Sequence, residues 1–250
     1  MTPLTATGAV CEDDVAALIR TIAPHVDAVL AALSTGEGWA LDAEQWLDMV
    51  RYTVRHAAGL PVVAGVLRAT TAEVIERAAI AAAEGVQAIA VSTPFGVEVS
   101  QDEMYEHFAT LDAVTSVPIV VYNETAVSGN KAELATLLRI CALPTVVAIK
   151  DSSADQETTR ALTSAAGEVA VWQGWEPLLV DGGPVDGFAI GLANIEPSLC
   201  AELFGSLSTD AEERVRQACE DNGLLEDDWF RRIKFRLHAE GTLSTPHTVR

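Results

Sequence analysis

Basic residues are scarce in this chain of 250 residues. Lysine and arginine together number 16, against 36 aspartates and glutamates, which sets a formal net charge of −20 at pH 7. A surface of that sign repels nucleic-acid phosphates and anionic lipid headgroups. The composition therefore argues against nucleic acids and membrane surfaces as partners.

Long apolar runs are missing as well. The longest ones are broken by Asp27, Glu84 or Gly85 before they reach the roughly 20 residues that span a bilayer. The first residues lack the basic segment and apolar run of a secretory signal. Because 49% of the residues are hydrophobic, one large core can be buried, and we expect a soluble, cytoplasmic protein.

Cysteine and histidine are few and dispersed. The four cysteines form no C-x-x-C pair, which argues against a disulfide framework and a zinc site. The five histidines form neither H-x-H nor H-E-x-x-H. Glu103 and His107 lie four residues apart on one predicted helix, which we interpret as a solvated surface pair. We therefore expect no metal site.

Apolar, β-branched runs recur along the chain. Three of them directly follow Pro61, Pro118 and Pro144. The others lie at residues 26–33, 86–92, 169–173 and 187–192. Each run is typical of a buried parallel strand.

The segments between these runs have helical periodicity. Residues 42–57 place Trp46, Met49 and Val50 on one stripe, as an amphipathic helix over a sheet does. Capping-box patterns predict four further helix starts, because a hydroxyl residue stands three positions before a glutamate or glutamine. Their first residues are Thr70, Ser100, Ser153 and Thr209.

Strand starts through the middle of the chain are about 25 to 35 residues apart, the size of a βα unit. Seven runs plus a short first strand near Leu4 predict an α/β fold, a (β/α)8 TIM barrel over residues 1–206. Residues 207–250 are predicted to be a short C-terminal helical appendage packed on the barrel. The alternative is an open doubly wound sheet, but no G-x-G-x-x-G follows the first strand, which disfavours its dinucleotide-binding form.

The candidate chemistry lies where strands end, since a barrel places its active site there. Lys150, one of only three lysines, follows a buried run, and partial desolvation lowers the pKa of such an amine toward values that suit a Schiff-base nucleophile. Tyr122 ends the preceding strand and can move protons. Position alone also allows Lys150 to reach solvent or pair with Asp151, and Tyr122 to be a packed ring with a wet hydroxyl.

A third candidate is the loop Ser34-Thr35-Gly36-Glu37, which follows a predicted strand. Hydroxyl and backbone N–H groups in such a loop can hold a carboxylate. The alternative is a plain helix cap.

Together these segments resemble the dihydrodipicolinate synthase / N-acetylneuraminate lyase superfamily of class I, pyruvate-handling lyases and aldolases. The loop at residues 34–37 is similar to its G-T-T-G-E motif, and residues 122–129 to its Y-N-x-P-x-x-[ST]-G segment. Residues 149–153 are similar to G-x-K-D-[ST]-S, the most specific of the three. Residues 186–194 are similar to the eighth-strand motif, and residues 233–250 to the C-terminal helix and ending of the family.

The resemblance implies a barrel in which Lys150 forms an imine with pyruvate or a related 2-oxo acid, without metal or organic cofactor. Tyr122 relays a proton, and Thr35 joins these two as a catalytic residue. Ser34, Thr35 and Gly36 bind the substrate carboxylate. A protonated imine acts as an electron sink for carbon–carbon bond cleavage. The resemblance also implies an aldehyde as second substrate and a homo-oligomer, either dimer or tetramer.

The remaining predicted substrate-binding residues are Glu124, Val127 and Ala189. Val127 stands where dihydrodipicolinate synthases carry an arginine for the second substrate's carboxylate, and Gly96 stands where they carry a relay tyrosine. Glu124 replaces a usual apolar residue, so it either faces the substrate, favouring a hydroxylated or cationic one, or turns into solvent.

The sequence therefore predicts a class I carbon–carbon or carbon–oxygen lyase or aldolase. Two alternatives stay open: a dihydrodipicolinate synthase with an altered relay, and a weakly active 2-oxo-acid-binding homologue.

Overall fold

The computed structural model describes residues 1–249, and the side chain of Val127 lies outside the described part. The chain divides into two compact units. The first comprises Met1–Ala64, Glu84–Val86 and Gly191–Arg250, and the second comprises Gly65–Ala83 and Gln87–Ile190. The predicted division at residue 206 stays a prediction.

The described residues contain seven strands, which follow one another in the sheet in chain order. They are β1 (Val29–Ala31), β2 (Val62–Val66), β3 (Ala88–Ser92), β4 (Ile119–Asn123), β5 (Val146–Asp151), β6 (Ala170–Gln173) and β7 (Gly187–Phe188). Each predicted apolar run contains one of them, and the pairs β1–β2, β3–β4, β4–β5, β5–β6 and β6–β7 are parallel. The prediction of a strand in each of these seven runs is thus confirmed.

The prolines stand just before the strands because they have no N–H to give to a ladder. The carbonyls of two of them accept hydrogen bonds from the neighbouring strand. Pro61 accepts a 2.9 Å hydrogen bond from the backbone N–H of Val29, and Pro118 accepts one of 2.9 Å from Ile89.

The helices lie between the strands and at the two ends of the chain. They are α1 (Glu12–Ile22), α2 (Ala43–His56), α3 (Thr71–Glu84), α4 (Gln101–Val114), α5 (Thr125–Ser128), α6 (Leu134–Cys141), α7 (Gln156–Ala165), α8 (Pro197–Ser206), α9 (Thr209–Asp221) and α10 (Trp229–Ala239), with short 3-10 turns η1 (Ala23–His25), η2 (Glu176–Leu178) and η3 (Leu192–Asn194). None of these helices, within residues 1–249, has the length and apolar character needed to cross a membrane.

Two of the four predicted caps are correct. Thr70 and Ser100 exchange hydrogen bonds with Glu73 and Glu103 in capping boxes. The predictions at Ser153 and Thr209 are wrong, because α7 is capped by Asp155 and α9 by Ser208.

In each of these two helices another side chain accepts the hydrogen bond of the N-cap in place of the predicted residue. At α7, the Ser153 N–H still bonds to Asp151, at 3.2 Å, so the helix has not begun there. The charged carboxylate of Asp155 then accepts from the N–H of Glu157 at 3.1 Å. At α9, the Ser208 hydroxyl, one residue earlier than predicted, accepts from the N–H of Ala211 at 3.2 Å.

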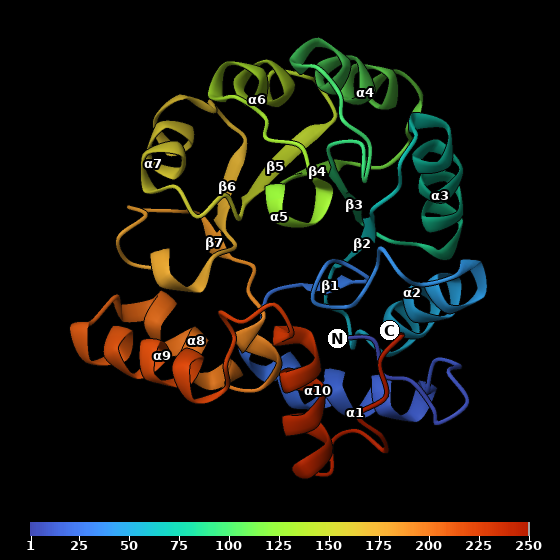
Figure 1. Ribbon diagram of the computed structural model, residues 1–250, viewed down its shortest axis with the longest axis vertical. Coiled ribbons are helices and arrows are strands. Elements are labelled where there is room, and N and C mark those ends of the chain that lie inside the picture. The colour runs from blue at the N-terminus through green and yellow to red at the C-terminus, as the bar shows by residue number, and fades with distance from the viewer. Residues whose placement is uncertain (250) are drawn as a thin grey trace. The chain divides into compact units, whose positions relative to one another are not determined.

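In the second unit, β3 and β4 are buried along their whole length. Figure 1 shows α4, α6 and α7 along the outer side of β4 to β6. Helices therefore cover one side of these strands, as βαβ connections require.

In the first unit, α2 spans most of the predicted helix at 42–57 and buries Trp46, Met49 and Val50. The expected C-terminal helices are α9 and α10, and α8 and α9 pack side by side (Figure 1).

The predicted first strand is wrong. Leu4 forms only an isolated antiparallel bridge with Val10. The chain turns back within a few residues: Thr5 N–H bonds to Ala9 O at 2.7 Å, and Gly8 lies in the left-handed region at a φ of +90°. A segment that reverses this early pairs with itself and leaves no length for a parallel strand.

A buried ion pair ties α10 to the loop after β1 within the first unit. The Lys234 ammonium contacts the Glu37 carboxylate, and their side chains are 0% and 2% exposed. Lys234 also donates to His247 O at 2.8 Å, and Glu37 accepts from the N–H of Val249 at 2.8 Å. Both charges are therefore compensated by partners rather than by water.

We expect Lys234→Met to lower the free energy of unfolding by about 3–5 kcal/mol, because it leaves the Glu37 carboxylate buried without its cation. Urea denaturation followed by circular dichroism measures the loss. The double variant Lys234→Met with Glu37→Gln should recover part of it, since the stranded charge is gone. A double variant no more stable than the single one would contradict this account.

Candidate active site

The ends of β4 and β5 carry the predicted chemistry on two opposite faces. Tyr122 pairs in register with Lys150, and Asn123 pairs with Asp151. Because successive side chains of a strand alternate between faces, Tyr122 and Lys150 share one face. Asn123 and Asp151 share the other.

Lys150 is buried, with 5% of its surface exposed. Its ammonium donates to the Ser152 hydroxyl at 3.0 Å and lies 4.0 Å from the centroid of the Tyr122 ring. The alternative in which Lys150 reaches into solvent is therefore wrong.

Burial lowers the pKa of Lys150 to about 8, because the ammonium loses hydration. Three carboxylates act in the opposite direction and raise this pKa: Glu176, Glu124 and Asp151. A group with a pKa of about 8 is neutral in roughly a tenth of molecules at pH 7, against well under a thousandth for an ordinary lysine. The site thus supplies a free amine near neutral pH.

Gly174, just after β6, makes room for this amine. A Cβ at this position would lie 2.2 Å from Ser152 Oγ and 2.9 Å from both Lys150 Cε and Nζ. Any side chain larger than hydrogen therefore displaces the amine or its hydroxyl partner.

The opposite face holds a polar network centred on Asp151, which is 1% exposed. Its carboxylate accepts from Asn123 Nδ2 at 2.8 Å and from the Thr159 hydroxyl at 2.6 Å. Gln173 Nε2 donates to Thr159 Oγ1 at 3.2 Å, and Gln173 Oε1 accepts from the N–H of Gly174 at 2.9 Å. The network links the ends of β4, β5 and β6 to α7.

Two further carboxylates act on the amine. Glu124, directly after β4, is 7% exposed, so the alternative that turns it into solvent is wrong. Glu176, in η2, was missed by the sequence reasoning, and it is the carboxylate with the largest effect on the pKa of Lys150. Its only sequence signal is that it follows the end of β6 by three residues.

Ala189 follows β7, and its N–H bonds to Gln173 O at 2.9 Å. Val127 lies in α5, but its side chain is outside the described part of the chain. The structure thus places Ala189 at the strand ends of the second unit and leaves the predicted role of Val127 untested.

The loop at Ser34–Glu37 belongs to the first unit and forms a tight turn, with Glu37 N–H bonded to Ser34 O at 2.8 Å. The Thr2 hydroxyl donates to Gly36 O at 2.6 Å, and Trp229 Nε1 donates to Thr35 Oγ1 at 3.3 Å. The helix-cap alternative is wrong, because Asp42 and Gln45 form the capping box of α2.

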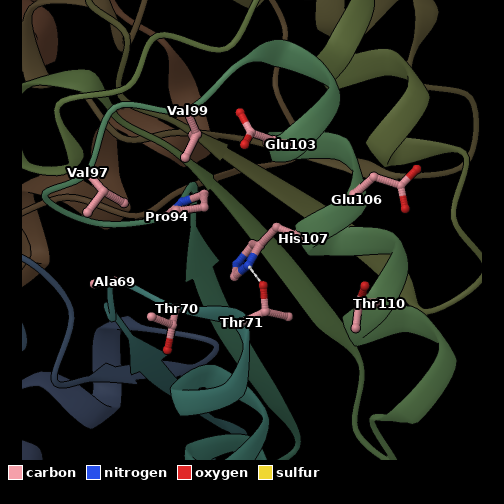
Figure 2. A pocket seen from close by; sticks show the side chains of 10 residues that line it. All are labelled: Ala69, Thr70, Thr71, Pro94, Val97, Val99, Glu103, Glu106, His107 and Thr110. Atoms are coloured by element: carbon pink, nitrogen blue, oxygen red, sulfur yellow. Dashed lines mark hydrogen bonds between the residues drawn. The ribbon is translucent and has the colours of Figure 1, made fainter.

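A cavity of about 350 Å³ in the second unit lies between the start of α3, α4 and residues 94–99 (Figure 2). Lys150 and Tyr122 do not line it. His107 does, with 3% exposure and Nδ1 2.9 Å from Thr71 Oγ1. Burial lowers its pKa to about 4, so the predicted solvated pair with Glu103 is wrong. The four-residue spacing of Glu103 and His107 does not reveal that His107 is buried while Glu103 is exposed.

Parallel strands alternating with helices, and a buried lysine against a tyrosine at adjacent strand ends, define an α/β protein of the barrel class with a lysine-centred site. The chain belongs to the dihydrodipicolinate synthetase family, whose profile matches residues 1–246. The resemblance seen in the motifs is thereby confirmed.

Similar proteins include 4-hydroxy-tetrahydrodipicolinate synthases of three bacteria. That of Koribacter versatilis is 34% identical over 51% of this chain and 43% of its own length. That of Hyphomonas neptunium is 32% identical over 78% of this chain and 69% of its own length. That of Acidobacterium capsulatum is 29% identical over 100% of this chain and 82% of its own length. The chain thus spans less than half of the first of these relatives and more than two thirds of the other two.

Solved structures agree on the fold. Dihydrodipicolinate synthase from Aquifex aeolicus has a TM-score of 0.90 and 23% identity, covering 99% of this chain and 88% of that one. The enzyme from Acinetobacter baumannii complexed with pyruvate has a TM-score of 0.88 and 23% identity, covering 99% and 89%. The barrel fold class predicted from the sequence is confirmed.

The titration of Lys150 can be observed directly by NMR, because the chain has only three lysines and therefore few lysine signals to assign. We expect NMR of protein labelled at lysine Nζ to show one signal with a midpoint near pH 8, absent in Lys150→Ala. Glu124→Gln should move this midpoint to lower pH, since it removes a charge that favours the ammonium. Glu168→Gln, which changes an exposed carboxylate of the same unit, serves as control, and equal shifts in both variants would count against the assignment.

Gly174→Ala should leave the fold intact and displace the amine. We expect the Lys150 signal to change its chemical shift and its midpoint, because the new methyl group overlaps Ser152 Oγ and Lys150 Nζ. Gly205→Ala in α8 meets no atom within 4 Å and is the matched control. An unchanged Lys150 signal in Gly174→Ala would refute the close packing.

Proposed function

We propose that this protein is a class I lyase or aldolase that acts on pyruvate or a related 2-oxo acid through an imine on Lys150. The observation that carries the proposal is the buried Lys150 amine, with a pKa of about 8 and in contact with the Tyr122 ring. Membership of the dihydrodipicolinate synthetase family and the names of its relatives support it.

The chemistry follows from the neutral amine. Lys150 Nζ attacks the C2 carbonyl of the 2-oxo acid, and the carbinolamine loses water to give a protonated imine. Loss of a C3 proton gives an enamine, which adds to an aldehyde carbonyl; the reverse sequence cleaves the same bond. All electrons come from the substrates, so the proposed mechanism calls for no metal or organic cofactor.

Tyr122 is proposed as the proton relay of these steps. Its ring lies against the Lys150 ammonium, and it comes from the adjacent strand in register. A phenol held next to the reacting nitrogen can give a proton to the departing hydroxyl and take one back. The position of the ring against the amine supports this role.

The loop Ser34–Gly36 is proposed to bind the carboxylate of the 2-oxo acid, with Thr35 acting in the reaction. Two hydroxyls and the backbone N–H groups of a tight turn are suitable donors for an anion. The cap role that competed for these hydroxyls belongs to Asp42.

The second substrate is proposed to be an aldehyde that is hydroxylated or cationic. Glu124 is buried and acts electrostatically on Lys150, so a negatively charged aldehyde would meet repulsion there. Val127 has no charge to offset it. Ala189, after β7, is proposed to line the same part of the site.

The second candidate function is a 4-hydroxy-tetrahydrodipicolinate synthase with an altered relay, which the names of the relatives favour. Pyruvate plus aspartate semialdehyde then gives cyclic product. A coupled assay measures this turnover. Efficient turnover would contradict the proposal, based on Glu124 and Val127, that the aldehyde is hydroxylated or cationic. A weakly active binding homologue is the third candidate, and both Lys150 and Tyr122 argue against it.

We also propose a homo-oligomer, either dimer or tetramer, in the cytoplasm. Membership of the family supports both proposals. Light scattering of the purified protein measures the assembly.

We expect borohydride reduction in the presence of pyruvate to attach the substrate covalently to Lys150, because an imine becomes a stable secondary amine on reduction. Peptide mass spectrometry locates the adduct, and Lys150→Ala should give none. A folded wild-type protein that forms no adduct with pyruvate or other 2-oxo acids would sink the proposal.

Tyr122→Phe should still form the adduct but lose enamine formation by about 10²- to 10⁴-fold, the usual contribution of a positioned acid or base. Exchange of the pyruvate methyl protons in D2O, followed by NMR, measures enamine formation without an aldehyde. Tyr105→Phe, on α4 against Arg139, is the control. Equal exchange in Tyr122→Phe and wild type would exclude the relay role.

A further inference from the structure

Trp229, the first residue of α10, donates its indole N–H to Thr35 Oγ1 at 3.3 Å. An indole N–H can only donate. The Thr35 oxygen is therefore the acceptor in this bond, and its own hydrogen points elsewhere. A hydroxyl that accepts this bond keeps its own hydrogen available to donate.

The indole is itself held in place by aromatic contacts within the first unit. Its ring centroid lies 6.3 Å from that of Trp39 and 5.3 Å from that of Phe230. Trp39 and Phe230 meet edge to face at 5.7 Å. Three half-buried rings in mutual contact leave Trp229 little rotational freedom.

The backbone of the loop is fixed from below. Gly38 lies so close to the end of β1 that a Cβ would be 1.8 Å from Ala32 O. Glu37, in the left-handed region at a φ of +58°, is bound by Lys234 and by the N–H of Val249. The backbone of the loop is thus fixed, and the hydrogen bond from Trp229 restricts the rotation of the Thr35 hydroxyl.

From these contacts we infer that Trp229 is a positioning residue for the 2-oxo acid: its N–H orients the Thr35 hydroxyl as a donor to the substrate carboxylate. This inference rests on the proposed function of the loop. A donor to an anion strengthens binding only if its hydrogen faces the anion. Helix α10 thereby tunes substrate affinity through one hydrogen bond, whose donor, Trp229, and acceptor, Thr35, are 194 positions apart in the chain.

The test measures exchange of pyruvate methyl protons in D2O as a function of pyruvate concentration, on the full-length protein. Trp229→Phe keeps a ring in the cluster and removes the N–H. We expect its half-saturating pyruvate concentration to rise roughly two- to twelvefold, the range that one hydrogen bond gives. The limiting exchange rate should change less than this concentration does, since Lys150 and Tyr122, the proposed imine and relay residues, are unchanged.

A double-variant cycle separates positioning from packing. Thr35→Val should also raise the half-saturating concentration, and Trp229→Phe should add nothing in the Thr35→Val background. Thr35→Ser, which keeps the hydroxyl, should retain the effect of Trp229→Phe. Trp39→Phe changes the same cluster without touching the Thr35 bond and should leave the affinity unchanged.

The outcomes are distinct. If Thr35→Val weakens pyruvate binding and Trp229→Phe does not, the inference is overturned and the proposed function stands. Equal effects of Trp39→Phe and Trp229→Phe, or additive effects in the double variant, overturn it in favour of packing. If the wild type exchanges and Thr35→Val matches it, the carboxylate role of the loop fails together with the inference. A wild type that does not exchange the protons removes the imine chemistry itself.

Discussion

The candidate active site depends on keeping one amine out of water at the end of β5. Burial of Lys150 disfavours its charged form, and this lowers the pKa to about 8 against the opposite pull of Glu176, Glu124 and Asp151. The balance is fine, because stronger desolvation would abolish the ammonium and stronger pairing would abolish the free amine. Gly174 and Ser152 fit this requirement: the first provides space for the amine and the second a neutral hydrogen-bond acceptor.

The same strand ends meet a second demand on their other face. Asp151 lies next to Lys150 in the chain, yet its carboxylate accepts from Asn123 and Thr159. Because successive side chains of a strand point to opposite faces, the Asp151 carboxylate and the Lys150 amine lie on different sides of β5 although the two residues are adjacent in the chain. Asp151 raises the pKa of Lys150 less than Glu176 and Glu124 do.

Much of this arrangement could be predicted from the sequence, because periodicity and strand ends are local signals. The seven strands follow from apolar runs, and the pairing of Tyr122 with Lys150 follows from parallel neighbours ending at one edge. Glu176 and Trp229 could not be found in this way, since their places depend on loop geometry or on contacts between distant segments. The helix starts at Asp155 and Ser208 were misplaced because neighbouring polar residues compete for one cap. The prediction of a first strand was wrong because the chain reverses in a tight turn near Gly8, so that Leu4 pairs with Val10.

The charge around the amine bears on which family activity the chain supports. The sequence resemblance aligns Val127 with an arginine of the family's synthases, and the buried Glu124 with an apolar residue. The Glu124 carboxylate adds a negative charge that acts on the Lys150 amine. In a partly buried site like charges repel by several kcal/mol at close range, so an aldehyde with its own carboxylate would meet repulsion there. A neutral or cationic aldehyde incurs no such cost, because the Glu124 carboxylate can accept from a hydroxyl or an ammonium group. The proposed imine chemistry and the negative charge of Glu124 are thus compatible, since the first depends on Lys150 and the second acts on the aldehyde that approaches it.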